Sequence, residues 1–212
     1  MVSLRVRALG AAMAALCALF LSAGALAEEP GSAVQELLNG ETLSPAEMQS
    51  GALNELVSDR LGTLLSSDMT TYEQVKTCYD FLLENMQYDS SMRHLDAPAG
   101  DGTCWDIFYS YGELEGFAAV ALSAHYGQCN GYAAAFIAMT RSIGLDARLV
   151  KGSTRGAGGG YVPHQWAELS LGGVPYIFDP QLDQNLAAQG LGEYGCFCLS
   201  YEDAGGRYLK GG

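Results

Sequence analysis

The stretch Tyr126-Gly127-Gln128-Cys129-Asn130-Gly131-Tyr132 decides how the rest of this sequence is interpreted. Its cysteine follows a glycine-containing break and opens an apolar pattern of helical period, carried by Ala133, Phe136, Ile137, Met139 and Ile143. The pattern predicts that Cys129 lies in the first turn of a helix. Unpaired backbone N–H groups and the positive end of the helix dipole lower the pKa of a thiol there. Cys129 is therefore a candidate nucleophile; the alternative is a small buried hydrophobic residue, the usual role of a free cysteine.

The segment from His164 to Asp179 predicts a β-hairpin. Two apolar, partly alternating runs flank Gly172-Gly173, a pair typical of a two-residue turn. With that turn, Trp166 lies opposite Asp179, and His164 lies opposite Gln181 and diagonal to Asp179 on the same face. Diagonal neighbours are about 7–8 Å apart at the backbone, a gap that an imidazole and a carboxylate can close with a hydrogen bond. The register thus predicts a pair between His164 and Asp179, which a shift of one residue would destroy.

A cysteine, an imidazole base and a carboxylate that orients the base are the parts of a thiol acyl-transfer site. Three motifs carry them: Gly-x-Cys129-x-Gly-Tyr opening a helix, His164-x-Trp on a strand, and Asp179-Pro ending the next strand. Together they resemble the transglutaminase-like superfamily, which has a papain-like core, and the resemblance covers about residues 72–199. It implies that Cys129 is the nucleophile, His164 the general base and acid, and Asp179 the orienting carboxylate.

The expected reaction is attack of the Cys129 thiolate on an amide or ester carbonyl, which gives a thioester acyl-enzyme and needs no metal or organic cofactor. The backbone N–H of Cys129 and one further donor would stabilise the oxyanion. Candidates for that donor are Gln128, Trp105 and Tyr111, and candidates for the substrate groove are Trp166 and Tyr161.

Four kinds of protein remain open at this point. Deacylation by water gives a peptidase or amidase, which we expect, whereas deacylation by an amine gives a crosslinking acyltransferase. A binding module could retain the fold without turnover. A redox protein could use Cys196 and Cys198 instead of Cys129.

Residues 1–27 have the pattern of a secretory signal peptide. Arg5 and Arg7 precede an apolar run from Ala8 to Leu21, and small residues end in Ala-x-Ala at Ala27. An uncleaved membrane anchor is the alternative. We expect a secreted or extracytoplasmic protein without a further membrane span, because no later apolar run is long enough.

The chain is acidic, with 11 basic and 24 acidic residues among its 212 and a formal net charge of −13. Removal of residues 1–27 takes away two basic residues and no acidic one, which leaves a net charge of −15. Such a charge disfavours nucleic acid or an anionic membrane as a partner, and no basic stripe with interleaved aromatic residues is present. The partner that we expect is a protein or peptide substrate, extracellular or in a cell wall.

Five cysteines follow residue 27, namely Cys78, Cys104, Cys129, Cys196 and Cys198. Because five is odd, an oxidising compartment would leave at least one thiol free, as a catalytic Cys129 requires. The other four could form two disulfides of unspecified pairing. Cys196 and Cys198 alternate on a predicted late strand, 191–199, and would share a face. Buried cysteines are favoured there over a zinc site, because no second spaced pair of ligands is present.

Helices precede strands along the chain, which predicts an α+β fold with an antiparallel sheet against the Cys129 helix. We divide the chain into the signal peptide 1–27, an acidic helical segment 28–67 and a transglutaminase-like catalytic domain 68–212. In the acidic segment, Ser44-Pro45-Ala46-Glu47 predicts the start of an amphipathic helix that packs on the catalytic core, with a spacer or propeptide-like arm as the alternative. A second helix is expected to begin near Thr70.

Three further features surround the expected site. Residues 87–111 predict a long surface loop that could wall a substrate groove, with His94 as a solvated residue in it. His125 is a rival base, disfavoured because no acidic partner lies nearby in sequence. The glycine-rich stretch 152–161 is either a flexible lid or a simple hairpin connection.

Overall fold

The computed structural model describes residues 30–91, 93–156 and 158–211. The predicted signal peptide lies outside these residues. Within them, no helix is both long enough and apolar enough to cross a membrane. The helices are α1 (Ser32–Asn39), α2 (Gly51–Leu64), α3 (Thr71–Asn85), the 3-10 helix η1 (Arg93–Asp96), α4 (Cys104–Tyr111), α5 (Glu113–Ala124), α6 (Cys129–Ile143) and α7 (Pro180–Ala188). The strands are β1 (Gln87–Tyr88), β2 (Pro98–Ala99), β3 (Gly102–Thr103), β4 (Tyr126–Gly127), β5 (Ala147–Arg155), β6 (Tyr161–Leu171), β7 (Val174–Phe178), β8 (Phe197–Ser200) and β9 (Tyr208–Lys210).

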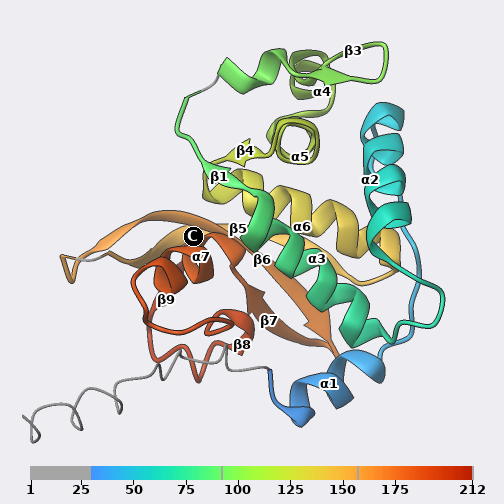
Figure 1. The fold of residues 1–212 in the computed structure, drawn as a ribbon. Coiled ribbons are helices and arrows are strands. Elements are labelled where there is room, and N and C mark those ends of the chain that lie inside the picture. Colours follow the sequence, from blue (N-terminus) through green and yellow to red (C-terminus); the bar gives the residue numbers. More distant parts are fainter. Residues whose placement is uncertain (1–29, 92, 157, 212) are drawn as a thin grey trace, which may run out of the picture.

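The last five strands form one sheet in the order β8-β7-β6-β5-β9, and every neighbouring pair is antiparallel. Helix α6 packs on β5 and β6 and separates the sheet from α5, so the layers follow the order sheet, α6, α5, α4 (Figure 1). The expected α+β fold, with the cysteine-bearing helix on an antiparallel sheet, is confirmed.

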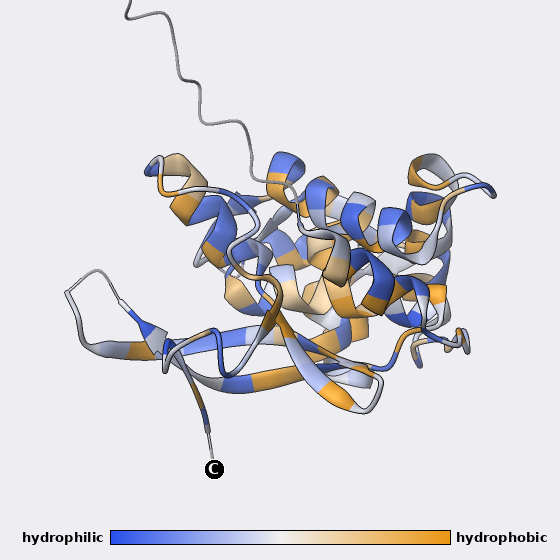
Figure 2. Ribbon diagram, turned by 90° about the horizontal axis from the view of Figure 1, so that it is seen from below, coloured by the Kyte–Doolittle hydropathy of each residue, from blue (hydrophilic) through white to orange (hydrophobic). Residues whose placement is uncertain are grey.

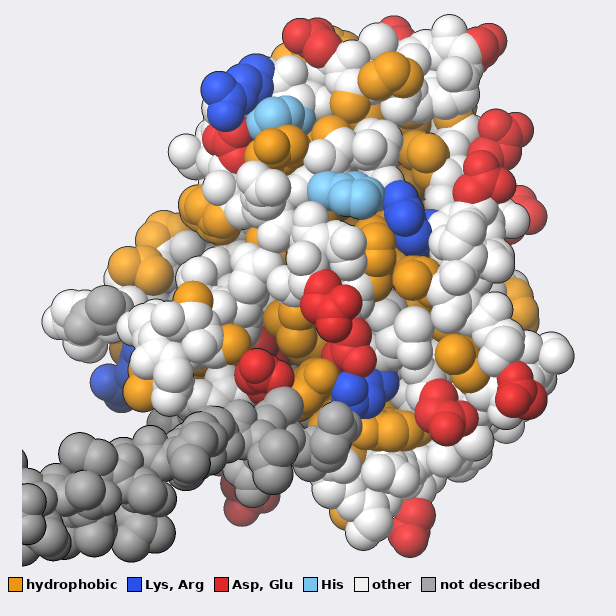
Figure 3. All heavy atoms as spheres, viewed as in Figure 1, with side chains coloured by type: hydrophobic (Ala, Val, Ile, Leu, Met, Phe, Trp, Pro, Cys, Tyr) orange, Lys and Arg blue, Asp and Glu red, His pale blue; other side chains and the backbone are white. Residues whose placement is uncertain are grey.

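Helix α6 is central because its small and apolar side chains allow close packing on both sides. Every residue from Gly131 to Thr140 is buried. Helices α5 and α6 pack on each other, and both carry several buried alanines, whose short side chains suit close packing of helices. In Figure 2 the helices gather on one side of the sheet, with orange and blue bands alternating along them. Acidic side chains are scattered over the face drawn in Figure 3, where cationic ones are few.

The predicted start of the second helix is confirmed by helix α3. The Thr70 hydroxyl accepts a hydrogen bond from the backbone N–H of Glu73, and the Glu73 carboxylate accepts one from the backbone N–H of Thr70. This reciprocal pair is a capping box, which can be read directly from a Thr-x-x-Glu spacing.

The amino-terminal segment packs on the core, as expected, but its long helix begins later than predicted. Leu53 and Val57 of α2 are buried in the main core. Helix α2 begins at Gly51 with Ser50 as its cap. The backbone N–H groups of Ser44 and Ala46 instead donate to carbonyls at the end of α6, and this docking holds residues 40–50 out of a helix.

The expected surface loop 87–111 is wrong in its second half, which forms helix α4. The signal for it is Thr103 with Asp106, another capping box, in which the Asp106 carboxylate accepts from the Thr103 backbone N–H at 2.8 Å. Aromatic residues interleaved among glycines and a proline concealed this helix in the sequence.

The end of the chain also differs from the prediction. The predicted late strand 191–199 is paired only from Phe197 onward. Cys196 and Cys198 are buried in different clusters, because the register shifts where β8 meets Ile177 and Phe178, and because Cys198 adopts a φ of 55°. Their expected common face is therefore wrong.

Candidate active site

Cys129 is the first residue of α6, as its position in the sequence predicts. Gln128 caps the helix through its backbone, and no side chain accepts from the first turn. The N–H groups of such a turn have no partner within the helix and attract negative charge. The Cys129 side chain is half-buried, whereas the other four described cysteines are buried.

The hairpin of β6 and β7 places His164 and Asp179 together. Leu171 pairs with Val174 and Ala167 with Phe178, which is the predicted register. His164 Nε2 lies 2.6 Å from Asp179 Oδ2, and because a carboxylate only accepts, Nε2 carries the proton. The ring nitrogen Nδ1 is then the one left for the thiol.

The route by which Asp179 reaches His164 differs from the diagonal strand pairing that the sequence predicts. The chain leaves the sheet after Phe178, and Asp179 is the N-cap of α7, with its Oδ1 accepting from the Leu182 backbone N–H at 3.1 Å. Gln181, which we expected opposite His164 on the strand, lies in the first turn of that helix. The helix cap therefore fixes the carboxylate more firmly than a strand position alone would.

The structure adds a residue that the sequence analysis missed. The Tyr208 hydroxyl donates to Asp179 Oδ2 at 2.8 Å, so that this oxygen accepts from both His164 and Tyr208. Tyr208 is buried and lies on β9, where it pairs with Thr154 of β5. No local motif marks a three-residue strand at this place in the sequence, and its partner strand lies far back along the chain.

The charges of the site favour a thiolate beside an imidazolium. Burial raises the pKa of the Cys129 thiol, but its hydrogen bond with His164, the charge of that ring and the Gln165 backbone N–H together lower it below its ordinary value. Burial lowers the pKa of His164, but the hydrogen bond and charge of Asp179, followed by those of Cys129, raise it to about 10. At neutral pH both shifts stabilise the ion pair.

The other described thiols have the opposite tendency. Burial raises the pKa of Cys78 and of Cys198 to about 12, and it also raises the pKa of Cys104 and of Cys196. Cys129 is thus the one described cysteine whose pKa is lowered. None of the five forms a disulfide within the described residues. The described residues also contain no cluster of three side chains suited to a metal ion.

A groove of about 540 Å³ opens at Cys129 and His164. The hairpin of β5 and β6 forms one wall, through Thr154, Arg155 and Val162, and α7 forms another. The glycine-rich stretch is this hairpin: β5 continues to Arg155 and β6 begins at Tyr161, so it connects two strands while its base borders the groove.

Two of the three candidates for the second oxyanion donor are not brought to the thiol. Trp105 and Tyr111 lie on α4, which packs on the far side of α5 from α6 (Figure 1). Trp105 stacks on Tyr109 with 5.2 Å between the ring centroids. Gln128 precedes Cys129 directly, and its side-chain Nε2 donates to the Ser90 carbonyl at 3.2 Å.

Neither residue expected in the substrate groove lines it. Trp166 is fully buried, and its Nε1 donates to the Tyr201 hydroxyl at 2.9 Å. It faces the small cluster that contains Tyr208 because it is two positions from His164 on the strand. Tyr161 is exposed but directs its hydroxyl to the Gly206 carbonyl, which holds the hairpin to the following loop.

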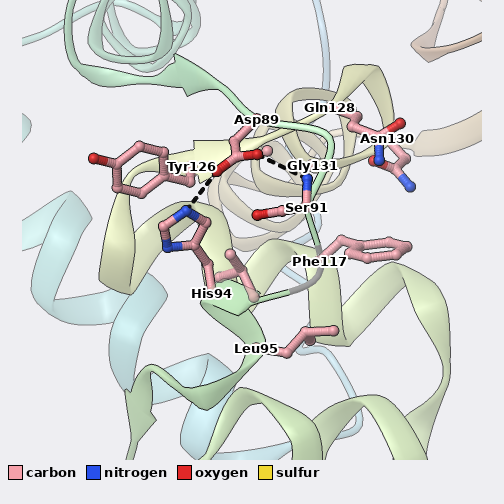
Figure 4. Close-up of a pocket in the computed structure, with 11 residues that line it drawn as sticks. Asp89, Ser91, His94, Leu95, Phe117, Tyr126, Gln128, Asn130 and Gly131 are labelled. Carbon is pink, nitrogen blue, oxygen red and sulfur yellow. Dashed lines mark hydrogen bonds and ion pairs between the residues drawn. The ribbon is translucent and has the colours of Figure 1, made fainter.

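His94, expected to be solvated, lies in a second, narrow hollow that Gln128 and Asn130 also line (Figure 4). Its Nε2 lies 2.8 Å from Asp89 Oδ2, and its ring stacks on Tyr126 with the centroids 3.9 Å apart. The sequence did not predict these contacts of His94, because Asp89 and Tyr126 lie in separate segments and no pattern in the sequence shows that the two segments meet. The hollow is too small for more than about one water molecule.

His125, the rival base, is directed elsewhere. It ends α5 with a φ of 62°, and its Nε2 lies 3.1 Å from a terminal nitrogen of Arg60. Burial, followed by the charge of Arg60, lowers its pKa. His125 was disfavoured as a base because no acidic partner lies nearby in sequence. In the structure its partner is the cation Arg60 and not a carboxylate.

The family model described as the transglutaminase-like superfamily matches residues 60–180, more than half of the chain. The chain therefore belongs to the transglutaminase-like superfamily. Members of that superfamily are usually cysteine-dependent enzymes.

Two solved structures are similar to this chain at low sequence identity. A protein from Cytophaga hutchinsonii, described provisionally as a cysteine protease, is 20% identical over 72% of this chain and 43% of its own, with a TM-score of 0.40. A structure described as a TGase is 17% identical over 61% of this chain and 31% of its own, with a TM-score of 0.41. This chain thus spans less than half the length of either. A search of curated proteins gave no match.

Proposed function

We propose that this protein is a cysteine-dependent peptidase or amidase that works through a thioester acyl-enzyme. The observation that carries the proposal is one continuous chain of contacts. It runs from the Cys129 thiol to His164 and from His164 Nε2 to Asp179 Oδ2 at 2.6 Å. The lowered pKa of Cys129 among thiols of raised pKa supports the same assignment.

The steps follow from the positions of these groups. The Cys129 thiolate attacks the amide carbonyl carbon, and the C=O electron pair moves to the oxygen. The backbone N–H of Cys129 stabilises this oxyanion, with the Gln128 amide as the remaining candidate for a second donor. The imidazolium of His164 gives its proton to the leaving nitrogen, the C–N bond breaks, and the thioester remains. Asp179 keeps the ring oriented throughout.

Water then completes the cycle. His164 takes a proton from the water as its oxygen attacks the thioester, and the released thiolate regains its imidazolium partner. If an amine replaces water, the same intermediate yields a crosslinked product. We place the activity outside the cytoplasm because of the pattern in residues 1–27, on a protein or peptide substrate. Amino-terminal sequencing of the exported protein tests this location, since it should begin at Glu28.

The deciding experiment is mass spectrometry of the protein incubated with a peptide library and a primary amine. We expect hydrolysed peptides and an acylated Cys129 with the unchanged protein, and neither with Cys129→Ala or His164→Ala. Amine-linked peptides in place of hydrolysed ones would show an acyltransferase. Unchanged peptides and an unmodified thiol would overturn the catalytic assignment in favour of a binding module.

A further inference from the structure

The groove at Cys129 differs in charge from the rest of the molecule. The chain has 24 acidic and 11 basic residues, yet none of the fourteen residues that line the groove is acidic. In the groove lining the imidazolium of His164 is paired with the Cys129 thiolate, and Arg155 is the remaining cation. Asp179 is buried behind His164 and does not line the groove. A cation in the wall of a groove without acidic side chains favours anionic ligands.

Arg155 has no ion-pair partner among the described residues. Its guanidinium carbon lies 5.2 Å from the centroid of the Tyr161 ring. Neighbouring cations on the sheet are paired instead: Lys151 with Glu113, and Arg148 with Glu168. A planar guanidinium with free N–H groups is well suited to a carboxylate, which it can bind through two parallel hydrogen bonds.

One buried polar side chain in the groove wall also has no partner. Thr154 is 4% exposed, and its hydroxyl has no hydrogen-bond partner among the described residues. Buried polar groups in folded proteins are normally paired, so this hydroxyl marks a place where a ligand completes the hydrogen bonding. Gln181 also lines the groove. The backbone of an extended peptide offers both donors and acceptors for these two side chains.

The strand geometry sets the backbone spacing between His164 and Arg155. Gly152 lies opposite His164, and Arg155 lies three residues further along β5. At about 3.4 Å per residue, this separation is about 10 Å. An extended peptide in the groove covers the same distance in about three residues.

We propose that the groove selects peptides that carry a carboxylate about three residues from the scissile amide, and that Arg155 binds this carboxylate. This inference rests on the proposed function for the identity of the scissile amide. Thr154 and Gln181 contact the intervening peptide backbone. Binding requires no covalent step, so the selection can be measured apart from turnover.

The test uses the full chain with Cys129→Ala, which removes turnover but not the groove. The probes are fluorescent octapeptides, acetylated and amidated at their ends, in which one Glu is moved through a neutral Gln-containing sequence. Fluorescence anisotropy should show one or two Glu positions that bind about five-fold more tightly than the all-Gln peptide. This preference should decrease in 0.5 M salt.

The variant Arg155→Gln in the same background should abolish the preference, and Arg155→Lys should keep part of it because the charge remains. The matched control is Lys151→Gln, which removes one positive charge from the same strand outside the groove and should leave the preference intact. Circular dichroism establishes that each variant is folded. Equal binding of Glu and Gln peptides, or equal losses in the Arg155 and Lys151 variants, would overturn the proposal.

If the protein is not a cysteine-dependent peptidase or amidase but the groove does select a carboxylate, the experiments give a different result. In that case the Glu preference persists in the Cys129→Ala protein, but the unchanged protein forms no acyl-enzyme with the same peptides. Recognition of the carboxylate would then stand, and the protein would be a peptide-binding module.

Discussion

The hydroxyl of Tyr208 donates a 2.8 Å hydrogen bond to the oxygen of Asp179 that also accepts from His164. Both residues are buried, so water does not replace this bond when it is lost. A hydrogen bond to a buried charged group contributes about 1.5–3 kcal/mol. Tyr208 is therefore a positioning residue: it holds the carboxylate that holds the imidazole.

We expect Tyr208→Phe to lower kcat about ten-fold or more with little change in KM, because no substrate contact is removed. The less firmly held carboxylate stabilises the imidazolium less and so lowers the pKa of His164, which should move the alkaline limb of the kcat/KM profile to lower pH. The matched control is Tyr201→Phe, whose hydroxyl bonds Glu168 at 2.7 Å instead of Asp179. If the role of Tyr208 were purely structural, the pH profiles of Tyr208→Phe and Tyr201→Phe would be the same.

The pKa shifts of the site predict how Cys129 reacts with iodoacetamide. Because its pKa is lowered, the thiol should be alkylated faster than the other four below pH 8. In His164→Ala, burial remains and now raises the pKa above the ordinary thiol value of 9.0, so the rate at pH 6.5 should fall at least ten-fold. His125→Ala is the control and should leave the rate unchanged. Slow labelling that is insensitive to His164 would show that the thiol is not activated.

A buried carboxylate on β6 predicts a dependence of stability on pH. Glu168 is 1% exposed and pairs with Arg148, Lys210 and Tyr201. Burial raises its pKa, but the hydrogen bonds from Lys210, Tyr201 and Arg148 outweigh burial and lower the pKa below 4.5. The stability from Glu168 is thus fully present above pH 4.5 and is lost as the pH falls through the lower folded-state pKa.

Glu168→Gln should therefore cost about 2 kcal/mol of unfolding free energy at pH 7 and less at pH 3. Urea unfolding at the two pH values measures the difference. The exposed pair of Lys151 and Glu113 gives the control, because Glu113→Gln should change stability by less than about 1 kcal/mol at either pH. An equal loss of unfolding free energy in Glu168→Gln at pH 7 and pH 3 would show that the pKa of Glu168 is not lowered in the folded protein.

Gly152 should not tolerate a side chain. A Cβ there would collide with the Leu209 carbonyl and would lie 2.8 Å from Trp166 Cη2. Gly152→Ala should therefore displace β9 and lower Tm by about 10 °C, with loss of activity as Tyr208 leaves Asp179. Gly158→Ala is the control, because nothing lies within 4 Å of its Cβ position. Calorimetry and a peptide-cleavage assay check both variants. Equal Tm values for Gly152→Ala and Gly158→Ala would show that Gly152 has room for a side chain.

The sequence predicted the parts of the site that depend on local order. A glycine break before an apolar helix places Cys129, and a two-glycine turn determines the register that brings His164 to Asp179. The expected start of a helix near Thr70 is likewise confirmed by α3, whose capping box joins residues three apart. In each case the interactions that decide the structure lie within a few residues or across one tight turn, where spacing alone carries the information.

The parts that were missed depend on contacts between distant segments. Tyr208 reaches Asp179 because β9 pairs with β5, and three residues without a turn signal do not reveal that pairing. The groove candidates failed for a related reason. Trp166 shares a strand face with His164 but is fully buried beside Tyr208, and Trp105 is separated from the thiol by a helix. An aromatic residue in a sequence indicates apolar surface but not which side of a layer it covers.

The position of Tyr208 also has a consequence in time. A ribosome releases the thiol, the imidazole and the carboxylate before the strand that carries this tyrosine. The nascent chain can assemble its reactive residues early but cannot lock them until β9 docks against β5. The hydrogen bond from Tyr208 to Asp179 can therefore form only after residue 208 has been synthesised, later than the contact between His164 and Asp179.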